Sequence, residues 1–369
     1  LGVTLPEPLG KGAEDQRPLQ VALEVDDEQL LSRSSYGDVR ALIRLRQSKN
    51  GWTLDRGGVR ADAVAPALPS HRGLRIEGNV QRFVLDDWLA LRGADSNPGA
   101  GSGDDDGPKL SDYLQAANVR VADFQIFGYR FADLRGRLQA TQSGWRVDVS
   151  GDNAAGQVLI PESFIGTQPL RATMERLVIN KVPASERAAA ADNDDEDLDP
   201  RNLPNMQIYV GSLLLGSRAV GAVDLKATRV AQGIRFDNAT IMAESARADA
   251  KGQWLRTVDG PRSTLDATIE SKDVAATLKS LGYTPFIEAR RGEITADLAW
   301  NGGFDSNILE HASGAISVEA ESGQIVNLQP GAGRVLGLFS VGALPRRLAL
   351  DFSDLTEKGL AFDTIHGDF

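Results

Sequence analysis

The side chains that could carry acid–base or metal chemistry are few and scattered in this chain. It has no cysteine, and its three histidines, His71, His311 and His366, are isolated from one another in the sequence. The zinc-protease pattern H-E-x-x-H and the nucleophile pattern G-x-S-x-G are both absent. We therefore expect no catalytic residue, no metal site and no cofactor, and we interpret the histidines as exposed or turn residues.

Three short motifs resemble ligand sites but lack the required spacing. Aspartates cluster at residues 104–106 and 192–199, but neither cluster has the glycine and the bidentate glutamate of an EF-hand calcium loop. The PGAGR segment at residues 330–334 lacks the Lys-Ser/Thr ending of a phosphate-binding loop. We therefore interpret the aspartate clusters as solvated acidic loops, and we expect no nucleotide site.

The formal charge of −11 is concentrated in two segments. Residues 94–109 carry a net charge of −3 and residues 184–200 carry a net charge of −6, and both are rich in small and polar residues. We predict that these segments are disordered surface loops. A nucleic-acid-binding protein needs clustered Lys and Arg for its phosphate contacts, so the composition argues against nucleic acid as a partner.

The ends of the sequence predict that it is part of a longer protein. It opens on Leu1 without an initiator Met and stops at Phe369, directly after a strand-like motif. It contains neither the roughly 18 consecutive apolar residues that a membrane-spanning helix needs nor a signal-peptide pattern. Any membrane anchor is therefore expected outside this chain.

Alternation of apolar and polar residues is the dominant pattern, and it is typical of strands with one buried and one solvated face. It occurs in the segments 134–140, 265–270, 293–300 and 316–320. Such a pattern indicates antiparallel sheet with two different faces. Helices are expected to be few and short, at residues 85–91 and at residues 273–281, where Asp273 is the predicted N-cap and Gly282 the stop signal.

A five-residue motif predicts a repeated hairpin. It consists of glycine, a large apolar residue, any residue, a second apolar residue and aspartate, and it occurs at residues 51–55, 144–148, 233–237 and 359–363. The glycine is expected to supply the turn, and the apolar residue to begin the return strand. The second and third copies lie 89 residues apart with similar upstream strands, which indicates an internal repeat and an array.

The apolar face of this sheet needs a cover, and the predicted helices are too few to supply it. A second sheet would give a sandwich or a closed barrel, whereas a curved sheet would leave a groove for apolar ligands. The residues alone favour the sandwich, because it is the commoner way to bury such a face.

The C-terminal segment resembles a known protein family. Residues 322–369 contain PGAGR, an apolar helix to Ala343, LPRRLALDFSDL at 344–355 and KGLAFDTIHGDF at 358–369. This order of motifs is similar to the C-terminal region of the AsmA-like YhdP family, large envelope proteins of Gram-negative bacteria. WLRT at 254–257, LKSLGYTP at 278–285 and RGEITADLAWNGG from Arg291 are similar to the family's preceding segment, with Asn301 where a proline is expected.

The resemblance implies a mainly β fold: an elongated, twisted antiparallel sheet curled into an apolar groove, with few short helices. It also implies non-enzymatic transfer of phospholipid between the inner and outer membranes, which supports the outer-membrane permeability barrier. The chain would be a periplasmic portion of an inner-membrane-anchored protein, with phospholipid acyl chains as partners and both membranes contacted through parts outside it. We expect one continuous region, 1–369, with pseudo-repeats at about 1–109, 110–200 and 201–369.

Under this resemblance, apolar positions on the inward face are expected to line the groove collectively. The predicted lining residues are Leu134, Leu138, Val147, Leu225, Ile269, Leu298 and Val318. Phe339, Arg346 and Arg347 are predicted contacts with a membrane or with the end of the groove. Two alternatives stay open: an assembly factor or chaperone for outer-membrane proteins, which would pair strands at a free sheet edge, and a structural β-sandwich scaffold.

Overall fold

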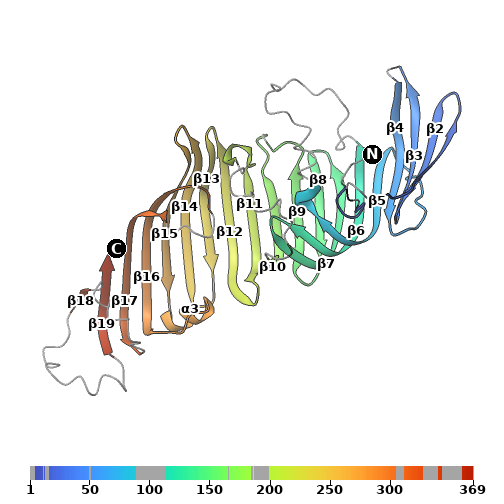
Figure 1. Cartoon of the computed structure of the whole chain (residues 1–369). Coiled ribbons are helices and arrows are strands. Elements are labelled where there is room, and N and C mark those ends of the chain that lie inside the picture. The colour runs from blue at the N-terminus through green and yellow to red at the C-terminus, as the bar shows by residue number, and fades with distance from the viewer. Residues whose placement is uncertain are drawn as a thin grey trace. The chain divides into compact units, whose positions relative to one another are not determined.

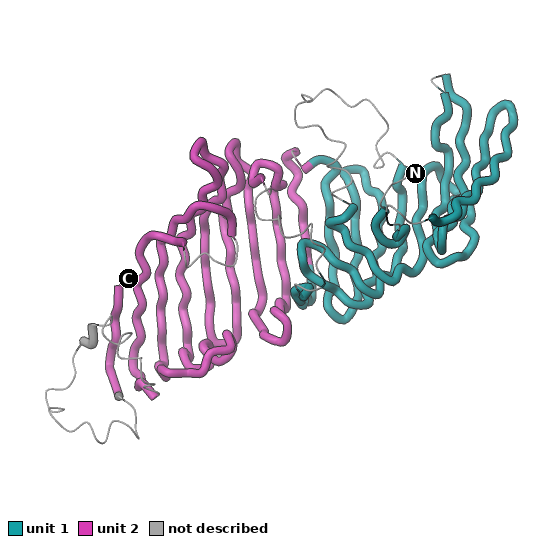
Figure 2. The backbone as a smooth tube through the Cα atoms, in the orientation of Figure 1, with its two compact units in different colours: residues 1–163, 174–187 teal, residues 164–173, 188–369 magenta. Residues whose placement is uncertain are grey.

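Strands dominate the structure, as the alternating sequence pattern predicts (Figure 1). The computed structural model describes residues 5–10, 12, 16–49, 51–88, 113–164, 166–183, 186, 199–304, 311–326, 340–342 and 360–368. The described chain forms two compact units, shown in different colours in Figure 2: residues 1–163 with 174–187 (unit 1), and residues 164–173 with 188–369 (unit 2). The predicted fold class, mainly β with an extended sheet and few short helices, is confirmed.

Unit 1 is built from sequential strands. They are β1 (Leu19–Val25), β2 (Gln29–Tyr36), β3 (Val39–Ser48), β4 (Gly51–Ala61), β5 (Gly73–Val84), β6 (Leu114–Ile126), β7 (Tyr129–Thr141), β8 (Gly144–Ser150), β9 (Ala154–Pro161) and most of β10 (Leu170–Lys181). Neighbours in sequence pair from β1 to β9, and most pairs are antiparallel. The exceptions are β4–β5 and β5–β6, which are parallel, so the expectation of a purely antiparallel sheet is wrong at these two pairs.

Unit 2 continues the same sequential scheme with antiparallel pairs. Its strands are β11 (Met206–Leu215), β12 (Arg218–Val230), β13 (Gly233–Met242), β14 (Ala246–Thr257), β15 (Gly260–Ser271), β16 (Ile287–Asn301), β17 (Ser313–Ile325), β18 (Ser340–Gly342) and β19 (Leu360–Asp368). A 3₁₀ turn, η3 (Pro200–Asn202), and a helix, α3 (Val274–Ser280), complete the described elements of regular structure in this unit.

The glycine motif forms hairpins at the three copies whose glycine the structure describes. Gly51, Gly144 and Gly233 each begin the return strand with positive φ, at 106°, 132° and 156°. Gly233 also lies against a neighbouring strand, since an added Cβ would be 2.2 Å from the Trp254 carbonyl oxygen. Glycine is therefore required there both by backbone conformation and by close approach. The fourth copy begins at Gly359, outside the described residues.

The predicted helix at residues 273–281 is confirmed as α3. Asp273 is its N-cap, and the Ala276 backbone N–H donates to the Asp273 carboxylate over 2.9 Å. The helix stops at Gly282, which has a φ of 85°. Of the other predicted helix, residues 85–88 are helical and residues 89–91 lie outside the described part. The acidic loop 94–109 lies wholly outside it, as does most of the loop 184–200.

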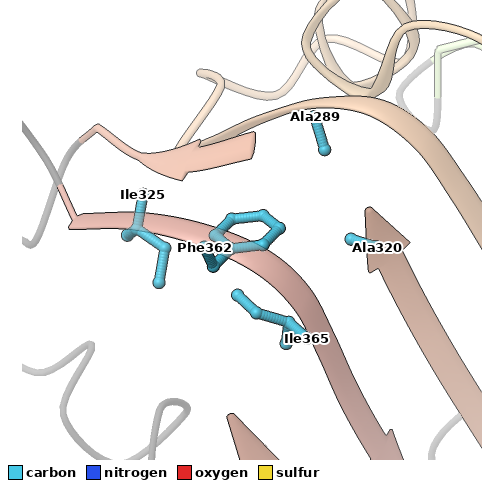
Figure 3. Packing of buried hydrophobic residues seen from close by; sticks show 5 residues of the cluster. All are labelled: Ala289, Ala320, Ile325, Phe362 and Ile365. Carbon is cyan, nitrogen blue, oxygen red and sulfur yellow. The ribbon is translucent and has the colours of Figure 1, made fainter. Parts of the chain in front are cut away.

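A packed apolar cluster of unit 2 lies where β16, β17 and β19 pair. Figure 3 shows Phe362 and Ile365 of β19 beside Ile325, Ala320 and Ala289. Val274 of α3 and Ile287 pack against this cluster. The helix therefore packs on the sheet through the partly buried Val274 in its first turn.

Candidate functional site: an apolar face on each sheet

One face of the unit 2 sheet is apolar across seven consecutive strands. Because directly paired residues of neighbouring strands share a face, the strand register defines rows of side chains that run across the strands. The first row, from β11 to β17, is Val210, Val223, Ile241, Ala248, Ile269, Ile294 and Val318. Every member is apolar, so this row forms an unbroken apolar band.

Two parallel rows widen this band. The second row is Ile208, Leu225, Ala239, Ala250, Ala267, Ala296 and Ile316. The third row is Ala227, Phe236, Gly252, Leu265, Leu298 and Gly314. The central row is mostly alanine in its middle strands, so the larger side chains of the outer rows rise on both sides of it. We call the three rows together the apolar strip of unit 2.

The opposite face of the same strands is polar. The row between the first two apolar rows is Asp224, Thr240, Asp249, Thr268, Thr295, Ser317 and Asp368. Each of these residues adjoins an apolar residue in sequence and points to the other side of the sheet. The unit 2 sheet thus separates an apolar face from a solvated face.

The apolar strip remains open to solvent at β16. Ile294 lies on β16, between β15 and β17, and its exposed fraction is 37%. An isoleucine at a central strand of a closed sandwich would be buried by the opposing sheet. The exposure of Ile294 therefore argues against the sandwich that residue patterns alone favour.

Two elements border the strip at opposite ends of the strands. At one end α3 packs on the sheet, because a Cβ on Gly292 would lie 2.7 Å from Val274 Cγ2. At the other end the residues after β16 fold back. The Ser263 hydroxyl donates to the Gly302 carbonyl over 2.7 Å, and the Trp300 indole N–H donates to the Gly303 carbonyl over 2.7 Å.

Phe304 completes the second border. Its ring lies 5.0 Å from the rings of Phe236 and Trp300, with edge-to-face angles of 79° and 86°. Such geometry is favourable for aromatic pairs. The border is therefore an aromatic cluster, whereas the border at α3 is mainly aliphatic.

The unit 1 sheet has the same two-faced construction. One of its apolar rows, from β3 to β9, is Ala41, Val59, Ile76, Ala117, Leu138, Val147 and Val158. The adjoining row on the opposite face is Arg40, Arg60, Glu77, Asn118, Arg137, Asp148 and Gln157. The parallel pairs keep the register of faces, so the apolar row passes through β4, β5 and β6 without interruption.

All seven predicted lining residues lie on these apolar faces. Leu225, Ile269, Leu298 and Val318 belong to the unit 2 strip, and Leu138 and Val147 to the unit 1 row. Leu134 on β7 pairs with Val121 on β6, and Val121 pairs with Val80 on β5. These three residues form a second apolar row of unit 1. Leu298 is only 7% exposed and acts more as core than as surface. Phe339, Arg346 and Arg347 lie outside the described residues.

The roles of Phe304 and Asp55 could not be predicted from the sequence. Phe304 follows a strand in a connecting segment, where neither periodicity nor a motif marks it. Asp55 is the last residue of a glycine motif, and the register shift between β3 and β4 leaves it as the extra residue of a bulge. Asp237 occupies the same position of another copy and is also the extra residue of a bulge.

Asp55 anchors a charged cluster in unit 1. It is 2% exposed, and the Arg44 Nε donates to its carboxylate over 2.8 Å. Arg56 and Arg72 lie 3.7 and 3.6 Å from the same carboxylate. Burial alone would raise the pKa of Asp55, but the hydrogen bond and charge of Arg44, with further arginines, lower that pKa below its ordinary value. The cluster ties the segment after β4 to the sheet.

The histidines show no grouping among the described residues. His366 Nε2 lies 3.0 Å from the Asp368 carboxylate on the same strand, and His71 and His311 are exposed. Within the described ranges, no set of three or more His, Asp or Glu side chains is placed to hold a metal ion. In the same part of the chain, no helix combines the length and apolar character needed to cross a bilayer.

The fold and the site define a class: a mainly β protein whose described strands present an apolar face on one side of the sheet. The chain belongs to the YhdP protein family, whose model matches residues 1–369. It is 25% identical over 375 residues to the intermembrane phospholipid transporter YhdP of Escherichia coli (strain K12). The match covers 98% of this chain and 28% of that relative, so the chain spans between a quarter and a third of the relative's length. No solved structure gives a significant match.

Proposed function

We propose that this chain carries phospholipid without chemical conversion, as one section of a route between the inner and outer membranes. The observation that supports this most directly is the partly exposed Ile294 on β16, within an unbroken apolar row that runs from β11 to β17. A soluble core residue would be covered, whereas a residue that receives an acyl chain must be reachable. The relative named for intermembrane phospholipid transport supports the same function.

The energetics explain why such a strip would be useful. Exposing an acyl chain to water costs about 0.8 kcal/mol per CH₂ group, which is on the order of 20 kcal/mol for the two tails of a phospholipid. An apolar strip removes most of this cost, while the headgroup stays in water. A lipid that moves along the strip would therefore avoid the main barrier to crossing an aqueous compartment.

The dimensions of the unit 2 strip fit acyl chains. Strands lie about 4.8 Å apart, so the strip from β12 to β17 is about 24 Å long, whereas one tail occupies about 15 Å, half of a bilayer core. Neighbouring rows on one face lie about 7 Å apart. The alanine row between two rows of larger residues would seat a tail lengthwise, across the strands.

The predicted lining residues would then act collectively. Many apolar side chains share the contact, so truncation of any one should change transfer little. A charged side chain should have a larger effect, because an unpaired ion on an apolar path is strongly disfavoured. We propose that the chain acts in the periplasm and that the membrane anchor lies in another part of the longer protein.

One feature keeps an assembly-factor function as a second candidate. All seven residues of β1 are exposed, and Leu19, Val21, Leu23 and Val25 alternate along it. An edge strand of this kind can pair with an incoming strand of another protein. A factor that assembles outer-membrane proteins would use this edge, whereas a lipid carrier would use the apolar face.

Native mass spectrometry of the chain with added phosphatidylglycerol tests the two functions. Lipid transfer predicts several bound lipids, with fewer on a variant that carries a charge in the strip. A lipid-free mass under the same conditions would overturn the proposed function. Saturable binding of a β-strand peptide to β1, without lipid binding, would favour the assembly factor instead.

A further inference from the structure

A group of exposed apolar and basic side chains lies at the C-terminal end of α3. Leu281, Tyr283 and Phe286 have exposed fractions of 54%, 64% and 47%. Lys279, in the last turn of α3, and Arg218, at the start of β12, are also exposed. We call these five residues the basic–aromatic patch.

Hydrogen bonds hold the backbone of this patch in one conformation. At the end of α3, the Tyr283 N–H donates to the Leu278 carbonyl over 2.9 Å and the Gly282 N–H to the Lys279 carbonyl over 3.0 Å. This is a Schellman motif, with Gly282 in the left-handed conformation. The patch is therefore a built surface and not a loose loop.

Arg218 fixes the patch to the sheet. Its Nη1 donates to the Leu281 carbonyl over 3.3 Å, and a Cβ added to Gly282 would lie 2.7 Å from its guanidinium carbon. The arginine thus lies directly beside the exposed turn. Its charge therefore lies next to the turn that carries Leu281 and Tyr283.

The exposed side chain of Tyr283 departs from the usual packing of a Schellman motif. In a Schellman motif, the residue in the position of Tyr283 commonly packs its apolar side chain against the last turn of the helix. Here Tyr283 is 64% exposed, although its backbone is fixed. An exposed ring on a fixed backbone loses little conformational freedom when it binds, which favours a contact surface.

The charges of the patch select an anionic partner. No carboxylate occurs between Lys279 and Ile287, nor between Leu215 and Ala222 around Arg218. Tyrosine and phenylalanine beside Lys and Arg are the residue types that lie at the headgroup level of a bilayer. A membrane surface with anionic phospholipid supplies both the apolar layer and the negative charge that these side chains match.

We infer that the basic–aromatic patch docks unit 2 on the surface of an anionic phospholipid bilayer. Tyr283, Phe286 and Leu281 would enter the headgroup layer, while Lys279 and Arg218 contact lipid phosphate. This inference goes beyond the proposed function, because docking at this patch and lipid binding on the strip use different residues. The two can therefore fail separately.

Vesicle flotation of the 369-residue chain tests the inference. The vesicles contain phosphatidylethanolamine with phosphatidylglycerol, and phosphatidylcholine vesicles serve as the uncharged comparison. Tyr283→Ser combined with Phe286→Ser should lower the bound fraction at least about tenfold, and Lys279→Glu should lower it about tenfold in low salt. Val258→Ser is the matched control, because Val258 is a fully exposed apolar residue in the β14–β15 turn, remote from α3 along the strands.

Docking predicts that Val258→Ser floats like the unmodified chain and that the double variant does not. The inference is overturned if the unmodified chain does not float with anionic vesicles, or if the double variant floats equally well. It is also overturned if the double variant changes the oligomeric state in light scattering while flotation stays unchanged, since the patch would then be a protein interface. The number of bound lipids counted by native mass spectrometry should be the same for the double variant and for Val258→Ser. This measurement separates docking at the patch from lipid binding on the strip.

Discussion

Ile269 on β15 lies directly opposite Ile294 on β16, and in the adjoining pair of these antiparallel strands Glu270 lies opposite Glu293. The two pairs occupy opposite faces of the sheet, because successive side chains alternate. The apolar pair continues into Val318, and the acidic pair continues into Glu319. A single strand register therefore creates both the apolar strip and a row of like charges behind it.

A charge on the strip should impair lipid binding more than folding. Ile294→Asp places a carboxylate at a partly exposed position, so we expect a loss of about 1 kcal/mol or less in stability. The same carboxylate would lie on the acyl-chain path, where an unpaired ion is disfavoured. Native mass spectrometry should show several-fold fewer bound phospholipids, and lipid transfer by the longer protein should fall.

Thr295→Asp is the control for this prediction. It introduces the same charge one residue away, on the polar face. It should leave lipid binding unchanged. Equal lipid binding by the chains carrying Ile294→Asp and Thr295→Asp would show that the strip does not receive acyl chains.

Two glycines with positive φ should differ in their tolerance of alanine. Gly233→Ala would place a Cβ 2.2 Å from the Trp254 carbonyl, whereas a Cβ at Gly260 meets nothing within 4 Å. Both substitutions cost about 1 kcal/mol or more for the backbone conformation. Gly233→Ala must also displace a strand, so we expect a loss of about 3 kcal/mol or more, measured by urea unfolding.

If Gly233→Ala and Gly260→Ala had similar urea-unfolding midpoints and slopes, the close approach of β14 to Gly233 would not explain the glycine. The β13–β14 contact at Gly233 would then be loose enough to absorb a methyl group. A larger loss at Gly233 would support the close approach of the two strands as the reason for glycine in the motif.

The alternating residues predicted the two faces correctly because strand geometry alone decides which side chains share a face. Ile269, Leu298 and Val318 lie together on the apolar face as the pattern requires. The sequence did not reveal the parallel pairing of β5, because parallel strands usually need a longer crossover that often contains a helix. Here residues 62–72 make the connection without a described helix and pass close to Gly58, where a Cβ would lie 2.4 Å from the Ala67 carbonyl.

The borders of the strip also escaped prediction, for a different reason. Phe304 owes its place to the folding back of the segment after β16, which Ser263 and Trp300 hold by hydrogen bonds to backbone carbonyls. The Ser263–Gly302 hydrogen bond and the contact of Phe304 with Phe236 join residues that are far apart in the sequence. Local patterns carry no information about such contacts, whereas the N-cap Asp273 and the stop residue Gly282 act within their own helix and were predicted.

The acidic row behind the strip should make a charge reversal stabilising. Glu293 lies directly between Glu270 and Glu319 on neighbouring strands, and like charges in this position are destabilising. Glu293→Lys would convert two repulsions into two attractions. We expect a gain of about 0.5–1.5 kcal/mol in the free energy of unfolding at neutral pH and low salt.

High salt provides the check on that charge reversal. Surface interactions are screened, so the gain should shrink in high salt if it is electrostatic. Glu244→Lys, in the turn between β13 and β14, is the comparison at a site outside the row. A gain of the same size at Glu244 would mean that overall negative charge, and not the row, is responsible.

The Asp55 cluster should make unit 1 sensitive to acid. Asp55 is buried, and the arginines around it lower its pKa below the ordinary value of 3.8. Stability from a carboxylate with a lowered folded pKa is fully present above the unfolded pKa and is lost as pH falls through the folded pKa. Asp55→Asn should cost about 2 kcal/mol at neutral pH, because it leaves the partly buried Arg44 without its charged partner.

The free energy of unfolding should differ between the unmodified chain and the Asp55→Asn variant by a constant amount from neutral pH to about pH 4. The difference should shrink below that pH. Urea unfolding at a series of pH values measures it. Asp148→Asn is the control, since Asp148 has the same motif position but accepts a hydrogen bond from Gln157 over 3.0 Å and is not a bulge residue. If this difference in the free energy of unfolding persisted unchanged well below pH 4, the ionisation of Asp55 would not be its source. The protonated carboxyl group would then stabilise the bulge through its shape and hydrogen bonds.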